Sequence, residues 1–108
     1  MPTMVQAGVY SAVHHYLEAV YALGTKDPDK VMAMMRETPI NDFMTENGQL
    51  RKDGRVVRDL YLFAVKTPQE SKGEWDYFKH LRTIPAEEAF RPLDAGGCPL
   101  VTKAAAEG

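Results

Sequence analysis

Six consecutive apolar residues, LYLFAV, occupy positions 60–65 of the chain. The run is aromatic and β-branched, and Pro68 limits it, which is typical of a strand that is buried on both faces. Such a strand needs a layer of structure on each side. The chain has 108 residues, the size of one domain with one modest core. Its other predicted elements supply one covering layer readily and two only with difficulty, so part of the cover is expected to be missing.

Residues 1–39 are predicted to form a pair of helices. Apolar side chains recur at steps of three and four over residues 4–23, and Gly24 follows as a suitable left-handed cap. A second helix is expected after Asp27, which can cap it, with Pro28 at its first position, and it should end before the next proline. Because the connection is short, the two helices should pack against each other.

Residues 40–68 are predicted to hold a hairpin and then the strand. The turn dipeptide Asp53-Gly54 separates residues 49–51 from residues 55–57, and this pattern fits two short strands joined by a tight turn. The apolar run follows a few residues later. This region is therefore expected to be the β part of the chain.

Residues 69–103 are predicted to form a short helix and an irregular meander. The helix is expected at about residues 74–81. Apolar side chains recur there at three-residue steps: Trp75, Phe78 and Leu81. Prolines and glycines interrupt the stretch beyond it. Residues 104–108 contain no large side chain and are expected to be a disordered tail, so the domain organisation is a single partial domain over residues 1–103.

The charge and cysteine content exclude several classes of protein. Thirteen basic and 15 acidic residues give a net charge of −2, which argues against binding to nucleic acid or to an anionic membrane surface. No apolar run approaches the length of a membrane span. One cysteine makes neither an internal disulfide nor a multi-cysteine zinc site. The first residues show no secretion signal, so the chain as written is expected in the cytoplasm.

The histidines and the cysteine are weak candidates for chemistry. His14 and His15 are adjacent, and neighbours on a helix point about 100° apart, so they do not converge on one metal ion. His80 has no acidic or cysteine partner at ligand spacing. Cys98 has no nearby helix N-terminus to activate its thiol. The three histidines are expected at solvated or border positions, and Cys98 is expected to be structural or to have no role.

The remaining candidates point no more strongly to an active site. Glu46 and the pair Glu87-Glu88 are expected to be solvated, and Gly48 and Gly54 lack the spacing of a phosphate-binding loop. Four methionines fit either the filling of a core or a plastic binding groove. They are Met32, Met34, Met35 and Met44. The sequence therefore predicts no catalytic residue, metal site or cofactor, and no enzyme activity.

Several short stretches, taken in order, resemble one known family. They are PTMVQAGVYSAV at 2–13, NGQLRKDGR at 47–55, VKTP at 65–68, WDY at 75–77, TIP at 83–85, AFRPL at 89–93 and GCPLV at 97–101. Their order and spacing resemble the type I periplasmic substrate-binding proteins of ABC transporters, in the branched-chain amino acid (Leu/Ile/Val-binding) group. The resemblance covers nearly all of residues 2–103.

The resemblance implies that the chain is a C-terminal fragment of a two-lobed α/β binding protein. By analogy the two helices belong to the first lobe, the hairpin region forms the last crossover, and the apolar strand enters the second lobe. The family's ligand contacts lie mainly in the missing parts, so the ligand-binding residues here are unknown. The resemblance also implies a periplasmic parent that captures a small amino acid or related organic acid and closes its lobes to engage a permease.

Two further expectations follow. In an oxidising periplasm, Cys98 is expected to pair with a cysteine outside this chain. The alternative to a ligand-binding role is a self-associating structural module. The helix at residues 4–23 and the strand at residues 60–65 would then lie at the interface of a homodimer, because a lone copy leaves both without enough cover.

Overall fold

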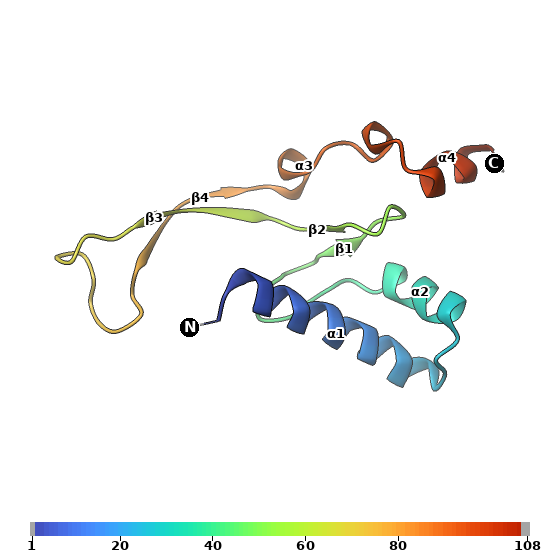
Figure 1. The fold of residues 1–108 in the computed structure, drawn as a ribbon, viewed down its shortest axis with the longest axis horizontal. Coiled ribbons are helices and arrows are strands. Elements are labelled where there is room, and N and C mark those ends of the chain that lie inside the picture. Colours follow the sequence, from blue (N-terminus) through green and yellow to red (C-terminus); the bar gives the residue numbers. More distant parts are fainter. Residues whose placement is uncertain (1, 107–108) are drawn as a thin grey trace.

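The computed structural model describes residues 2–106, with side chains as far as Thr102. The chain is elongated, with extents of 58 × 34 × 18 Å and a radius of gyration of 17.5 Å, whereas a compact domain of this length has a radius of about 13 Å. A helical pair lies on one side, and a long two-stranded ribbon extends away from it (Figure 1). The elements are thus spread out instead of being gathered around one core.

Helix α1, Met4–Leu23, begins and ends at good caps, as predicted. Thr3 and Gln6 form a capping box, in which each side chain bonds the other residue's backbone N–H. Gly24 closes the helix in the left-handed conformation with φ of 64°, which glycine adopts without steric cost.

Helix α2, Pro28–Glu37, also follows the prediction. The Asp27 carboxylate accepts a hydrogen bond from the Lys30 N–H at 3.1 Å, and Pro28 occupies the first turn. The helix packs beside α1 (Figure 1). Val31, only 2% exposed, and Ala19 of α1 are buried there.

The core of the described chain is small. Besides Val31 and Ala19, the buried hydrophobic side chain is Ile40, and the buried polar ones are His15 and Thr45. Most of the apolar stripe predicted on α1 faces solvent, with Val5 and Val9 at 69% and 60% exposure. The periodicity therefore identified the helix correctly, but only part of its apolar face is covered. No helix among the described residues is both long and apolar enough to cross a membrane.

The loop after α2 leads into the predicted hairpin. The backbones of Ile40 and Gly48 pair with each other, at 2.8 and 2.9 Å. A Cβ added at Gly48 would lie 2.5 Å from Cγ2 of Thr45, so this close approach requires glycine. Strands β1, Gln49–Leu50, and β2, Val56–Val57, then pair antiparallel around the Asp53-Gly54 turn, which confirms the hairpin.

Strand β3, Leu60–Val65, is present as predicted, but its partner corrects the sequence prediction. Residues 78–84 form β4, Phe78–Ile84, which pairs antiparallel with β3 through a bulge near Leu62. The short helix predicted at residues 74–81 is therefore wrong. Trp75 has φ of 69°, which no α-helix contains, and cross-strand aromatic contacts with β3 outweigh the local three-residue periodicity.

The predicted burial of β3 is also wrong for this chain. Its large side chains are between 36% and 76% exposed, because β4 is the one strand that pairs with it among the described residues. A two-stranded ribbon by itself is marginally stable in water. The apolar composition of β3 therefore fits a larger sheet than this chain supplies.

The C-terminal segment returns from β4 toward the β1–β2 hairpin (Figure 1). It contains three short helical elements separated by proline and glycine: α3, Ala86–Ala89, the 3-10 turn η1, Leu93–Gly96, and α4, Pro99–Ala106. Residues 104–106, which the sequence placed in a disordered tail, continue α4, because alanine has a high helix propensity. Residues 107–108 lie outside the described residues.

Candidate binding surfaces

The histidines are placed by packing and make structural contacts. The expected solvated or border position is wrong for His15, which is 5% exposed because α2 lies over it. Its Nε2 lies 2.8 Å from the carbonyl oxygen of Met35, so it links α1 to α2. His14 is half-buried, stacks on Tyr10 and lies near Glu18, with Nδ1 and Oε2 3.5 Å apart. His80 lies on the β3–β4 ribbon. Within the described residues, no three metal-ligating side chains gather at one point.

The predicted carboxylate candidates are solvent-exposed. Glu88 pairs with Arg82 on β4 at 3.3 Å, with both side chains largely exposed. Glu87 and Glu46 are exposed as well. The structure therefore does not bring these three carboxylates together.

Asp42 organises the loop between α2 and β1. Its Oδ1 accepts hydrogen bonds from the backbone N–H groups of Met44 and Thr45, both at 2.9 Å, and its Oδ2 accepts one from the Ser11 hydroxyl on α1. Partial burial raises the pKa of Asp42, but these three hydrogen bonds outweigh it, and the pKa lies below its ordinary value. The loop is thus held against α1 by an ionised carboxylate.

An apolar pocket of about 360 Å³ lies between α1, α2 and this loop. Its volume falls in the range of small-molecule sites. Ser11, His15 and Arg58 supply polar groups along its wall. Met32, Met35 and Met44 also line it, whereas Met34 lines a separate shallow hollow beside Ala19. The methionines therefore line hollows between the helices and the loop while staying half-buried.

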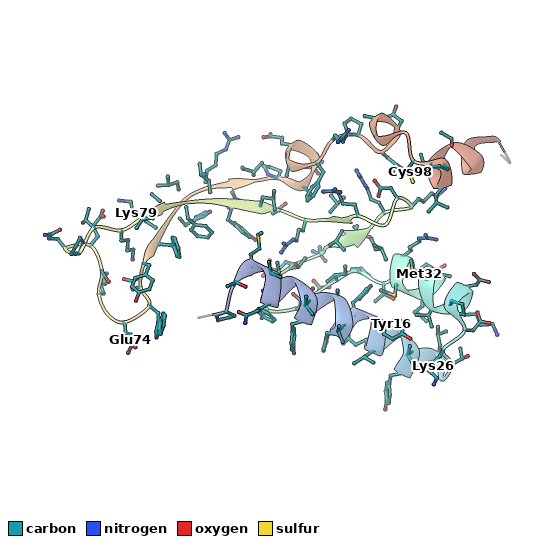
Figure 2. The ribbon with its side chains drawn as sticks, viewed as in Figure 1. Tyr16, Lys26, Met32, Glu74, Lys79 and Cys98 are labelled. Atoms are coloured by element: carbon teal, nitrogen blue, oxygen red, sulfur yellow. The ribbon has the colours of Figure 1, made fainter. Side chains whose placement is uncertain are left out.

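A second, polar pocket of about 450 Å³ separates the β1–β2 turn from the C-terminal segment. Arg51 and Arg55 line it from the turn, and Arg91 and Cys98 line it from the segment. Cys98 is a half-buried free thiol on the side of the segment that faces the turn (Figure 2). Sequence analysis singled out Cys98 but missed the arginines, since Arg91 is 40 residues from Arg51 and no local pattern joins them.

The β3–β4 ribbon presents apolar side chains on both faces. The strand register places five side chains on one face: Tyr61, Phe63, Val65, Phe78 and His80. The aromatic rings among them contact each other across the strands. Leu60 and Leu62 occupy the opposite face. Large, exposed apolar surfaces of this kind mark sites of further packing.

The loop that joins β3 to β4 is held by ion pairs. Lys66 pairs with Asp76 and Lys79 pairs with Glu70, both at 2.7 Å. The hydrogen bond from Lys79, followed by those from Thr67, lowers the pKa of Glu70 to about 2. The long loop between the strands therefore has a defined shape.

Comparisons with known proteins agree with this arrangement. The model of a family described as periplasmic binding protein matches residues 1–74. A periplasmic binding protein from Burkholderia mallei is 47% identical over 93% of this chain, with a TM-score of 0.84. A branched chain amino acid ABC transporter periplasmic ligand-binding protein from Burkholderia xenovorans is 48% identical over 93% of the chain, with a TM-score of 0.86. Comparison with curated proteins gives no match.

The arrangement of helices and strands matches a segment of two longer binding-protein structures. The chain belongs to the periplasmic binding protein family. One of its two solved relatives is a branched chain amino acid ABC transporter protein, which confirms the resemblance seen in the sequence. The chain spans 26% and 27% of the two solved chains that it matches, so it corresponds to about a quarter of their length.

Proposed function

We propose that this chain is a segment of the solute-binding component of an ABC importer, whose complete form binds a small amino acid or a related organic acid in the periplasm. One observation supports this most directly: the chain is 48% identical, over 93% of its length, to a branched chain amino acid ABC transporter periplasmic ligand-binding protein. The complete protein works by lobe closure around the ligand, and the closed form engages a permease. Its role is binding, without catalysis.

A chimera tests this proposal. The matching segment of the Burkholderia xenovorans protein is replaced by this chain, and thermal shifts are measured against a panel of amino acids and organic acids. We expect the chimera to fold and to bind the ligands that the unmodified protein binds. A chimera with Val31→Asp serves as the misfolded control, because it buries an unpaired charge. A chimera that melts like the unmodified protein but binds none of its ligands contradicts the proposal.

A second role, self-association of the isolated chain, is supported by the uncovered apolar surfaces of α1 and β3. Burial of about 800 Å² of apolar surface is worth on the order of 20 kcal/mol before entropic costs. We therefore propose a homodimer with these two elements at its interface. Light scattering at micromolar concentration should give twice the 12.1 kDa mass of one chain. A well-folded monomer would contradict the dimer and leave the importer proposal intact.

We also propose that Cys98 forms a disulfide with a cysteine outside this chain in the complete protein. Its free, half-buried thiol in the described structure supports this role, since the periplasm is oxidising. In the isolated chain, a thiol reagent should label Cys98 unless it bridges two chains. Full protection with no dimer band on a non-reducing gel would count against the proposal.

A further inference from the structure

Three arginines and one acidic residue, Asp53, line the polar pocket beside Cys98, so its lining carries a net positive charge. Arg51 is already satisfied: its Nη2 and Nε contact the two carboxylate oxygens of Asp53 at 2.7 and 3.2 Å, and its Nη1 donates to the carbonyl oxygen of Arg91 at 3.0 Å. Arg51 therefore ties the β1–β2 turn to the C-terminal segment and fixes the width of the pocket between them.

Arg55 and Arg91 are the uncompensated charges. Neither guanidinium is paired with an acidic group or donates a hydrogen bond among the described side chains. The guanidinium carbon of Arg55 lies 5.7 Å from the centre of the Phe90 ring, which holds the group in place while leaving its edge free. The pocket therefore presents free N–H donors from both of its walls.

We propose that this pocket binds a carboxylate ligand between Arg55 and Arg91. A guanidinium presents parallel N–H groups that match the two oxygens of a carboxylate. The volume of about 450 Å³ admits a small dicarboxylate that contacts both arginines. The site is distinct from the apolar pocket beside α1, and the inference does not rest on the proposed importer function.

Two sources of this carboxylate are possible in chemical terms. One is a small organic acid in solution. The other is an acidic side chain from the rest of a longer protein, since the chain spans about a quarter of the solved relatives. The arginines would recognise either carboxylate in the same way. In a complete binding protein, the pocket would stay open to a free acid in the first case and would already be filled by a side chain in the second.

Equilibrium dialysis of radiolabelled succinate against the isolated chain tests the site, with chloride at matched ionic strength as the reference salt. We expect a dissociation constant on the order of 1 mM. Arg55→Gln and Arg91→Gln should each weaken it about tenfold, the effect of losing one charge-assisted hydrogen-bonded pair. Arg36→Gln, at the exposed end of α2 and outside both pockets, is the matched control and should bind succinate normally.

Alkylation of Cys98 by iodoacetamide, a neutral reagent, is a second measurement. Succinate should slow it several-fold in the wild-type chain and not in the Arg55→Gln or Arg91→Gln variants. Succinate binding that is absent from the isolated chain, or that is unchanged in both variants, overturns the proposal.

The same dialysis on the Burkholderia chimera separates the two sources. Binding that persists there assigns the site to a free acid, and binding that is lost assigns it to a carboxylate of the longer protein. A chimera that fails to bind its amino acid ligand contradicts the importer proposal, but it leaves the result on the isolated chain unaffected.

Discussion

Asp42 shows how one side chain sets the course of the chain after α2. Its carboxylate holds two backbone N–H groups of its own loop and the hydroxyl of Ser11, 31 residues earlier. The loop is thereby fixed to α1 before the chain enters β1. Gly48 completes the arrangement, because any side chain there would collide with Thr45. The direction of the hairpin relative to the helices therefore depends on a few polar contacts.

Replacing Asp42 should make the fold less stable and less sensitive to acid. The folded pKa of Asp42 lies below 3.8, so its stabilising effect is present above the unfolded pKa and is lost as the pH falls through the folded pKa. We expect Asp42→Asn to lower the free energy of unfolding by about 1–2 kcal/mol at about pH 7 and by less at about pH 3. Urea unfolding at both pH values measures this.

Glu46→Gln is the control for this prediction. Glu46 lies in the same loop, and its exposed side chain makes no hydrogen bond among the described residues. Its replacement should leave stability nearly unchanged at both pH values. An Asp42→Asn variant with the same loss at acid and neutral pH would contradict the role assigned to the charge.

At the scale of elements, α2 and β3 differ in how well their apolar side chains are buried. Val31 of α2 is 2% exposed, whereas Val65 of β3 is 76% exposed. Val31 lies on the apolar face of an amphipathic helix and Val65 lies in an apolar strand, yet only the helix has its apolar face covered within the described chain. The β3–β4 ribbon is held by cross-strand contacts and by the ion pairs of its loop.

Truncation of the two valines should therefore have very different effects. Val31→Ala removes two buried methyl groups and should lower the free energy of unfolding by about 2 kcal/mol. Val65→Ala should change it by less than about 0.5 kcal/mol in a monomeric chain. Urea unfolding monitored by circular dichroism measures both.

The same two variants also test whether another part of a protein covers the β3–β4 ribbon. In the Burkholderia chimera, or in a homodimer built on β3, Val65→Ala should become costly as well, because the side chain is then buried. Equal effects of the two valines in an isolated monomer would contradict the exposure seen in this structure.

At the scale of the whole molecule, the chain is more extended than an independent domain of its length. Its radius of gyration of 17.5 Å exceeds that of a compact domain of its length. Its backbone nevertheless matches two solved binding proteins with TM-scores of 0.84 and 0.86. The same extended conformation occurs in relatives that are longer than this chain. It is explained if the matched segment packs against the parts of those relatives that lie outside it.

The isolated chain should therefore bind no small amino acid at sub-millimolar concentration. A binding cleft buries most of its ligand, and this requires walls from both lobes. Isothermal titration calorimetry against a panel of amino acids and aromatic acids measures it, with the unmodified Burkholderia xenovorans protein run alongside for comparison. Saturable heat with a micromolar dissociation constant would show that this chain forms a complete site.

The sequence by itself determined the features that depend on neighbours a few residues apart. Asp27 and Pro28 start α2, Gly24 ends α1, and the Asp53-Gly54 turn forms the hairpin, because caps and turns are local hydrogen-bonding and steric effects. The family was also readable, since the order of many short stretches is a property of the sequence.

Tertiary structure alone decided the rest. Residues 78–84 have a helical spacing of apolar side chains but form β4, because pairing with β3 satisfies the backbone and brings aromatic rings of the two strands into tilted contact. The arginine pocket joins Arg55 to Arg91 across the fold. His15 is buried because α2 lies over it. Each of these depends on segments far apart in the chain, and short-range periodicity carries no information about which distant segments meet.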